Sequence, residues 1–446
     1  MQLLSDSLSA SLPSGPVYPQ AYPEIEPDVL SSSDNFTSGQ PFDLFARLRA
    51  EAPVAWQREG SQGPGFWALT RYDDVMKVDG DPQTFSSQRG GILMAYGPPE
   101  SRHPLLFRAS VDAMINMDGQ SHLQLRREHM PYFTPAYLGA LKDKVAAETT
   151  RLIDAMAGLG ECDLVENLSS QLPLFTLCEI LGVPQADRPK FLTWMHYLEI
   201  AGHIAQTRRK AAEPSPELLK FVQAFNDNVA EMFEYGRRML KQRRAEPQAD
   251  LMTAIARATV DGELLRDEYL DGSWLLIVFA GNDTTRNTIS GAMKLFTENP
   301  DQRRALMGDM SLLPNAVDEV IRMVSPVIYM RRTASRDTEV GAQKIAAGEK
   351  VIMYFGAANR DPSVFADPDR FDIRRANAAK NIAFGFGPHV CIGKRVAQLQ
   401  LEEVYRQLFV RLPDIEYAGG IEIAPNNFVH AIRKLPVRFT PARKAG

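Results

Sequence analysis

The residues Phe384-Gly385-Phe386-Gly387-Pro388-His389-Val390-Cys391-Ile392-Gly393 stand directly before a helix predicted from Lys394 to Leu412. The three glycines of this stretch let the backbone turn tightly and approach a flat group closely. The N-terminus of the following helix directs free N–H groups and a positive dipole at the sulfur of Cys391. Such donors stabilise a thiolate that can bind iron. A single cysteine is more often an inert core residue, but this setting favours the ligand.

This loop resembles the haem-binding loop of the cytochrome P450 family, which reads Phe-x-x-Gly-x-x-x-Cys-x-Gly. The chain has Phe384, Gly387, Cys391 and Gly393 at those positions. The resemblance implies haem b as the cofactor, Cys391 as the axial ligand of its iron, and Phe384 and Gly393 among the residues around it. Three further motifs agree with the family pattern, so that the resemblance spans nearly everything after the N-terminal segment.

The first motif is Glu319-Val320-Ile321-Arg322, which places a carboxylate and a guanidinium on one helix face. Taken alone, such a pair usually lies on a solvated face. In cytochromes P450 the pair is buried, and an arginine from a Pro/Asp-rich meander completes it to brace the cysteine loop. Arg370 and Arg375 are both candidates for that arginine, and the sequence does not choose between them. The implied role is structural, because a buried ion pair that lacks one member leaves a costly charge.

The second motif, Ala280-Gly281-Asn282-Asp283-Thr284-Thr285, follows the apolar run from Trp274 to Ala280. One interpretation is a helix end capped by Asp283 and Thr284. The other is a continuous helix, because apolar spacing resumes at Ile289. The resemblance favours the second: Gly281 makes room for O₂ on the distal side of the haem, and Asp283 and Thr284 are catalytic residues that relay protons to the O₂ being activated.

The third set comprises cationic groups for the haem carboxylates. His122 and Arg126 stand four apart on one predicted helix face, with Ser121 as a plausible N-cap. The family pattern also places Arg332 and His389 at the propionates, with Arg331 as a possible substitute for Arg332. Arginine forks suit carboxylates well. Cys162 and Cys178 are interpreted as inert.

Composition limits the class of protein. The chain has 446 residues, 44% of them hydrophobic and 24% charged, with a net charge of −5, which is typical of a soluble globular protein. This balance disfavours nucleic acid as the main ligand. Three cysteines do not make a disulfide framework in so long a chain. The sequence shows no signal peptide and no membrane anchor, since its longest apolar run is far short of the ~20 residues that span a bilayer. We expect a cytoplasmic protein.

The pattern along the chain predicts a mainly helical α+β protein, with helices dominating from about residue 121 to 299 and short strands toward both ends, including Val54–Gln57 and Lys350–Phe355. Five prolines indicate that residues 1–35 form an extended arm. Residues 36–446 are expected to be a single P450 catalytic domain. An irregular segment from Phe85 to about Met114 is expected to form a lid over an apolar pocket.

The resemblance implies a haem-thiolate monooxygenase, because a thiolate ligand favours O–O cleavage. The sequence shows no dinucleotide fingerprint, flavin domain or iron–sulfur spacing, so electrons from NAD(P)H must arrive through a separate ferredoxin or flavodoxin and its reductase. Lys394, Arg395 and Arg127 are candidates for docking an acidic partner. We expect a monomer.

The substrate is expected to be a hydrophobic small molecule. Apolar residues predicted to line its pocket lie in the lid and in a later helix: Ile92, Leu93, Met94, Tyr96, Leu105, Leu106, Phe107, Trp194, Met195, Tyr197 and Leu198. Residues 281–287 and 330–334 resemble bacterial branches that hydroxylate alkyl chains, terpenoids and steroid side chains. Two alternatives are a haem-thiolate peroxygenase or isomerase, which the Asp283-Thr284 pair disfavours, and a non-catalytic haem-binding sensor.

Overall fold

The computed structural model describes residues 15–18, 22–59, 63–91, 103–198 and 215–442. Residues 188–198 form a helix, and the other helices carry labels. These are α1 (Phe42–Glu51), α2 (Tyr72–Gly80), α3 (Pro104–Val111), α4 (Gly119–His129), α5 (Pro135–Met156), α6 (Gln171–Leu181), α8 (Pro216–Ala245), α9 (Leu251–Arg257), α10 (Asp267–Ala280), α11 (Asp283–Glu298), α12 (Pro300–Gly308), α13 (Leu313–Val324), α14 (Phe355–Ala358) and α15 (Lys394–Arg411). The expected dominance of helices is confirmed.

The largest sheet has six strands in the order β1-β2-β3-β11-β8-β4. Its strands are β1 (Glu24–Ile25), β2 (Val54–Gln57), β3 (Phe66–Leu69), β4 (Phe85–Ser86), β8 (Tyr329–Ala334) and β11 (Lys350–Tyr354). The β3–β11 and β1–β2 pairs are parallel, and the others are antiparallel. The N-terminal part of the chain is thereby joined to residues about 280 positions later.

The smaller sheets use short strands. They are formed by β5 (Glu161–Asp163), β6 (Thr259–Val260), β7 (Glu263–Leu264), β9 (Thr338–Val340), β10 (Gln343–Ile345), β12 (Glu416–Tyr417), β13 (Glu422–Ile423), β14 (Ile432–Lys434) and β15 (Pro436–Arg438). β9 pairs with β10, β6 with β7 and β13 with β14, and β15 lies between β12 and β5. The strands expected near both ends of the sequence are therefore present.

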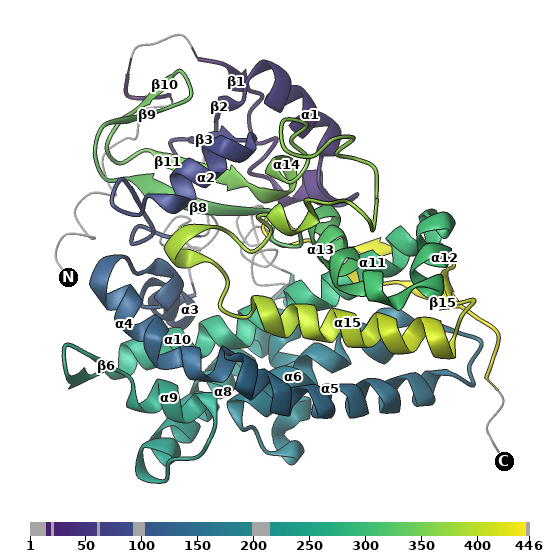
Figure 1. The fold of residues 1–446 in the computed structure, drawn as a ribbon. Coiled ribbons are helices and arrows are strands. Elements are labelled where there is room, and N and C mark those ends of the chain that lie inside the picture. Colours follow the sequence, from purple (N-terminus) through teal and green to yellow (C-terminus); the bar gives the residue numbers. More distant parts are fainter. Residues whose placement is uncertain (1–14, 19–21, 60–62, 92–102, 199–214, 443–446) are drawn as a thin grey trace.

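The main sheet is buried on both faces, which explains why its strands read as continuous apolar runs rather than alternating ones. Along β3, Phe66 and Ala68 join one apolar cluster, and Trp67 and Leu69 join the cluster on the opposite face. Figure 1 shows this sheet with α1, α2 and α14 around it, above a larger body of helices that contains α5, α6, α8, α10 and α15. The segment that leads into α15 lies between the two parts (Figure 1).

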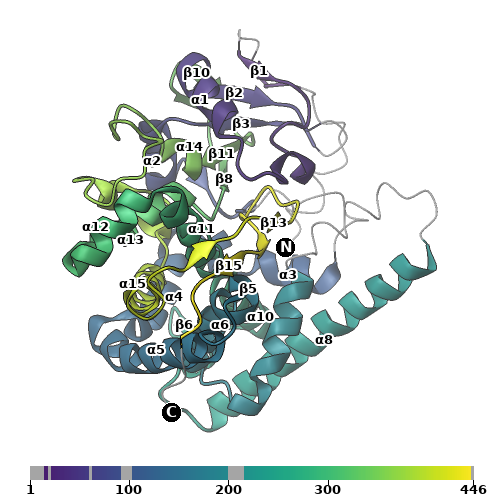
Figure 2. The ribbon, with the colours of Figure 1, turned by 90° about the vertical axis from the view of Figure 1, so that its right-hand side faces the viewer.

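Two of the body's long helices begin where the sequence places a hydroxyl residue before a proline. Thr134 caps α5 by accepting from the backbone N–H of Tyr137 at 3.4 Å, and Ser215 caps α8 by accepting from that of Leu218 at 3.2 Å. Proline suits the first helical position, because its missing N–H would lack a helical partner there in any case. Figure 2 shows α8 extending along one side of the body, where it packs against α10.

Three local expectations are wrong. The segment from Phe85 to about Met114 is not irregular throughout, because it contains β4 and α3. Ser121 is not the N-cap of its helix: α4 begins at Gly119, and Asp118 occupies the cap position. The helix around Asp283 is not continuous, because α10 ends at Ala280 and α11 begins at Asp283. Neither Asp283 nor Thr284 caps the second helix, whose cap residue is Asn282.

The described part of the N-terminal segment is only partly extended. Its short strand β1 pairs with β2, and residues Ser33–Phe36 form a 3₁₀ turn. Leu30 and Phe36 are buried in the sheet's apolar core. The segment is therefore attached to the sheet by both hydrogen bonds and packing. None of the helices that the structure describes is long and apolar enough to cross a membrane.

Candidate functional site

The loop before α15 holds Cys391 through its own backbone. The N–H of Cys391 donates to the carbonyl of Phe384 at 2.8 Å, which closes the loop immediately before the helix. Gly385 and Gly387 have φ values of +74° and +71°, in the left-handed region that other residues rarely adopt. The glycines at these two positions are therefore required by the turn, as the sequence predicts.

Cys391 is an exposed residue, whereas Cys162 is half-buried and Cys178 is buried. The surroundings of Cys391 raise its pKa, chiefly because they are poor in water; hydrogen bonds from the backbone of Gly393 and Lys394 and the charge of Arg126 act in the opposite direction. The expected N–H donors are thus present, but alone they do not make the thiol acidic. A metal ion that binds the sulfur would displace the proton.

Helix α4 presents two residues to this loop, one turn apart. His122 is buried, and its ring stacks on that of His389 with 4.1 Å between centroids. Arg126 Nη2 donates to the carbonyl of Val390 at 2.6 Å, directly before the cysteine. Burial, followed by the charges of His389 and Arg126, lowers the pKa of His122 to about 4. His122 is therefore neutral at pH 7, and its Nδ1 has no hydrogen-bond partner within the described residues.

His389 is held from its other side. Its Nε2 lies 3.3 Å from Asp118 Oδ1 and 3.3 Å from the hydroxyl of Ser87. Asp118 also accepts from the Ser86 hydroxyl at 2.6 Å and from the Ser87 N–H at 2.9 Å. The carboxylate at the start of α4 thus joins that helix, the end of β4 and the cysteine loop.

The two candidate arginines of β8 point to opposite faces of the sheet, as neighbours on a strand must. Arg332 is buried, and its Nη2 donates to Asp79 Oδ1 at 2.6 Å. Its Nη1 donates to the carbonyl of Arg331 at 2.9 Å, and its Nε has no partner within the described residues. Arg331 reaches the hydroxyl of Thr333 at 3.4 Å. Arg332 is joined to the cysteine loop through Asp79, which also accepts from the N–H of Phe386.

The interruption between α10 and α11 gathers polar side chains in a buried region. Asp283 is buried, and its carboxylate lies 3.6 Å from Arg286 Nη2. Asn282 Nδ2 donates to the same carboxylate at 3.3 Å, while Asn282 Oδ1 is buried without a partner among the described residues. The hydroxyl of Thr284 donates to the carbonyl of Ala280 at 3.3 Å, across the interruption. The acid and the alcohol therefore lie next to each other at an irregular point of the backbone.

Gly281 is the first residue of that interruption and the C-cap of α10. A Cβ at this position would come within 2.8 Å of Leu177 Cδ1 and 3.0 Å of the carbonyl of Ile277. The close approach of α6 is therefore one physical reason for a glycine here, and no pattern in the sequence indicated it.

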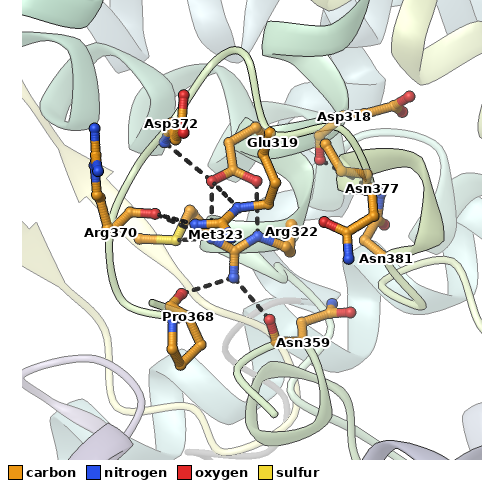
Figure 3. A network of polar contacts seen from close by, with 12 residues as sticks. Asp318, Glu319, Arg322, Met323, Asn359, Pro368, Arg370, Asp372, Asn377 and Asn381 are labelled. Atoms are coloured by element: carbon orange, nitrogen blue, oxygen red, sulfur yellow. Dashed lines mark hydrogen bonds and ion pairs between the residues drawn. The ribbon is translucent and has the colours of Figure 1, made fainter. Parts of the chain in front are cut away.

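The Glu319–Arg322 pair is fully buried, with Nε–Oε2 at 2.7 Å and Nη2–Oε1 at 2.8 Å. Between the two arginines that the sequence left open, Arg375 makes the side-chain contact, with its Nε 3.0 Å from Glu319 Oε1. Arg370 contributes only its carbonyl, which accepts from Arg375 Nη2 at 2.9 Å. Figure 3 shows how Glu319, Arg322 and the backbone of the meander converge.

This network reaches the cysteine loop through Asn359. Arg322 Nη1 donates to the carbonyl of Asn359 at 2.8 Å and to that of Pro368 at 2.7 Å. The side chain of Asn359 accepts from the N–H of Ile382 at 2.8 Å, two residues before the loop. The guanidinium, the meander and the start of the loop therefore form one connected unit, as Figure 3 shows for Arg322 and Asn359.

The expected pocket-lining residues are only partly placed. Ile92, Leu93, Met94 and Tyr96 lie outside the described residues. Leu105 and Leu106 lie on α3 and are half-buried against the main core. Trp194, Met195 and Leu198 are buried in that core, and the Trp194 ring packs on those of Phe191 and Tyr235. The apolar stripe at 191–198 is thus largely core packing.

Three polar residues at the site were missed by sequence reasoning: Asp79, Asp118 and Asn282. A hint for Asp79 is its place beside Val75 and Val78 on the buried face of α2. A charged residue in that position needs a partner.

The haem that the sequence predicts fits this arrangement. The thiol of Cys391 would hold the iron, and the positive-φ glycines leave the loop without side chains at the points of closest backbone approach. His122 Nδ1 and Arg332 Nε are buried polar atoms that lack partners in the described part of the chain. Two such atoms on different elements suit the two carboxylates of a haem.

Comparison with known proteins agrees with this fit. The family model described as cytochrome P450 matches residues 102–411. Linalool 8-monooxygenase of Pseudomonas putida is 35% identical over 94% of this chain and 100% of its own length. Steroid C26-monooxygenase of Mycobacterium tuberculosis is 34% identical, with coverages of 94% and 99%. The structure of Mycobacterium marinum CYP268A2 in complex with pseudoionone has a TM-score of 0.82 and 33% identity, and covers 95% of this chain and 100% of that one.

Proposed function

The chain belongs to the cytochrome P450 family, and we propose that it hydroxylates an alkyl, terpenoid or steroid-like molecule with electrons from a ferredoxin. As a member of this family with monooxygenase relatives, it is a haem-thiolate monooxygenase that uses O₂ and a redox partner on a hydrophobic substrate. The observation that carries the proposal is the exposed Cys391, held in a glycine loop that a buried ion-pair network braces.

When bound, the haem supplies the O₂ and C–H chemistry, and this chain's residues hold it and deliver protons. We assign the sulfur ligand to Cys391 and the carboxylate contacts to His122, Arg126, Arg332 and His389. Their support is the position of each beside the cysteine loop or joined to it. Glu319, Arg322 and Arg375 keep that loop in place.

Proton delivery is assigned to Asp283 and Thr284. The supporting geometry is their adjacency at the interruption between α10 and α11, where Asp283 is held by Arg286 and Asn282. An ionisable carboxylate next to a hydroxyl can pass protons inward and be recharged through solvent. Gly281 is assigned to the space for O₂ beside them. This acid–alcohol pair also favours a monooxygenase over a peroxygenase, an isomerase or a sensor.

The redox partner is proposed to dock near α4 and the start of α15. Arg127 and Arg395 are exposed there, and Lys394 is half-exposed with its ammonium 5.5 Å from the ring of Phe384. Leu123 on α4 and Phe386 in the cysteine loop are exposed apolar residues. An acidic ferredoxin suits such a cationic surface. NAD(P)H would supply the electrons through a reductase. The enzyme is proposed to be a cytoplasmic monomer in which residues 36–446 form a single catalytic domain.

The substrate class is proposed from the relatives and from the apolar character of α3. Linalool and steroid side chains are the substrates named for two relatives. The half-buried Leu105, Leu106 and Phe107 offer a surface that such molecules would contact. Arg108, which is exposed on the same helix, is paired with Glu268 at 2.7 Å.

A spin-state titration of the purified ferric protein tests this proposal. We expect terpenoids, steroids or long alkanes to shift the haem to high spin and to be oxidised when ferredoxin, reductase and NAD(P)H are all present. Turnover with peroxide alone, without these partners, would favour the peroxygenase. Ligand-induced shifts with no oxidised product under either condition would favour the sensor.

A further inference from the structure

Asp79, near the C-terminal end of α2, joins two parts of the haem site by both of its carboxylate oxygens. The side chain is buried, with 2% of the residue exposed. Oδ1 accepts from Arg332 Nη2 on β8 at 2.6 Å, and Oδ2 accepts from the backbone N–H of Phe386 in the cysteine loop at 2.7 Å. The first contact is a charge-assisted hydrogen bond with almost no solvent screening.

The end of α2 lies against the cysteine loop without space for another atom. A Cβ at Gly387 would stand 2.9 Å from the carbonyl oxygen of Asp79, and one at Gly385 would stand 3.1 Å from its Oδ2. A Cβ at Gly80 would stand 3.2 Å from the Phe386 ring. Because Gly385 and Gly387 have no side chains, α2 can approach the cysteine loop closely enough for the carboxylate of Asp79 to reach the loop backbone.

The contact with Asp79 also orients the N–H donors of Arg332. Its Nη2 is taken by Asp79 and its Nη1 by the carbonyl of Arg331 at 2.9 Å. Its Nε is buried and has no partner among the described residues. Asp79 thus orients the guanidinium and leaves its buried Nε N–H for an outside acceptor, such as a haem carboxylate.

We propose that Asp79 is a positioning residue of the haem site, which orients Arg332 toward a haem propionate, offsets its charge and holds the cysteine loop through Phe386. This proposal rests on the proposed function, since it requires a haem at Cys391. Arg332 with Asp79 is close to neutral as a unit, whereas Arg332 alone would add a positive charge beside the cofactor and favour the reduced iron.

The test compares three variants of the full-length haem protein. Asp79→Asn keeps an oxygen that can accept from Phe386 but removes the negative charge. The double variant Asp79→Asn/Arg332→Gln removes both charges. Asp73→Asn makes the same change at an exposed position of the same helix and serves as the control. The measurements are the midpoint potential of the haem, the rate of haem transfer to apomyoglobin, and the Soret position of the reduced carbon monoxide complex.

We expect Asp79→Asn to shift the potential to more positive values and to speed haem transfer by roughly 10-fold or more, the loss typical of residues that support cofactor ligands. The double variant should return the potential toward that of the original protein, which a purely structural role would not do. Equal potentials in Asp79→Asn and Asp73→Asn would overturn the proposal. A histidine-type Soret band in the unmutated protein would instead reject the proposed function itself.

Discussion

Two regions of the molecule are both buried and polar, yet they are built in opposite ways. One is the network of Glu319, Arg322 and Arg375 behind the cysteine loop, the brace, and the other is the interruption between α10 and α11. In the brace, each oxygen of Glu319 accepts at least one hydrogen bond, and Arg322 donates to several carbonyls of the meander. At the interruption, the backbone is irregular, Asn282 Oδ1 has no partner in the described residues, and the Asp283–Arg286 contact is long at 3.6 Å.

This difference matches two kinds of task. A metal ligand must keep its position, so that the groups supporting it are best fully satisfied by the protein. A proton relay must exchange partners during turnover, so that loosely committed groups serve it better. Variants of the two regions should therefore have different effects. Changes in the brace should weaken haem binding and stability, and changes at the interruption should lower the amount of product formed per NAD(P)H consumed.

The largest effect is expected at the sulfur. Cys391→Ala removes the sulfur ligand proposed for the iron, and we expect loss of the thiolate-type carbon monoxide spectrum together with all monooxygenase activity. Cys178→Ala, a change of the same size at a buried cysteine, should keep both. Retention of the thiolate-type spectrum by Cys391→Ala would assign the iron to another ligand.

A large loss of stability is expected in the brace. Glu319→Gln leaves Arg322 and Arg375 without their shared carboxylate, which should cost about 3–5 kcal/mol because both guanidinium groups stay buried. Urea unfolding monitored by circular dichroism measures this. The matched control is Glu416→Gln, which breaks the exposed pair with Arg438 and should cost less than about 1 kcal/mol. Equal costs for the two variants would remove the contrast between the brace and an ordinary surface pair.

Variants at the interruption should keep the haem and lose coupling. We expect Thr284→Ala to bind haem and consume NAD(P)H at a normal rate, while product falls by roughly 10²-fold, a typical contribution of proton transfer, and hydrogen peroxide accumulates. Thr288→Ala, one turn along the same helix, removes a hydroxyl that donates to the carbonyl of Thr284 at 2.7 Å and should stay coupled. Tightly coupled product formation by Thr284→Ala would contradict the relay.

The smallest effect concerns the stability of the folded protein at acid pH. Burial, followed by the charge of Arg126, lowers the pKa of His129 on α4 to about 4, against 6.5 for an ordinary histidine. Between these two pKa values the unfolded chain therefore binds more protons at His129 than the folded protein does. The contribution of His129 to the free energy of unfolding is complete above pH 6.5 and falls as the pH drops toward 4. This difference between the folded and unfolded pKa of His129 corresponds to about 3 kcal/mol of unfolding free energy.

His129→Phe should flatten this dependence, because it removes a buried group that must stay neutral. Urea midpoints measured between pH 7 and pH 4 report the slope. The control is His196→Phe, at an exposed position, which should follow the original protein. An unchanged slope in His129→Phe would show that another group sets the acid limit.

The sequence predicted those features that depend on local chemistry. The predicted strand Val54–Gln57 is β2 residue for residue, and the predicted helix from Lys394 ends within one residue of its expected end. Apolar runs, prolines and the glycine loop identify such elements without knowledge of their neighbours. Cys391 and the Glu319–Arg322 pair could be named for the same reason.

Tertiary contacts decided the rest. Apolar spacing continues across Gly281 and therefore concealed the interruption there, where Leu177 packs close to the backbone. Ser121 resembles a cap, but Asp118 precedes the helix. Arg370 and Arg375 are equally plausible in sequence, and only the path of the meander brings Arg375 to Glu319. Asp79 could not be assigned at all, because its two partners are about 250 and 300 residues away in the chain.

The parallel pairing of β3 with β11 also bears on how the protein is made. β3 ends at Leu69 and β11 begins at Lys350, so that at about 5–20 residues per second a ribosome needs roughly 15–55 seconds between them. During that interval β3, whose residues are all buried in the finished sheet, lacks its later neighbour. Chaperones that shield nascent apolar strands should therefore increase the yield of folded enzyme, and faster elongation should shorten the time at risk.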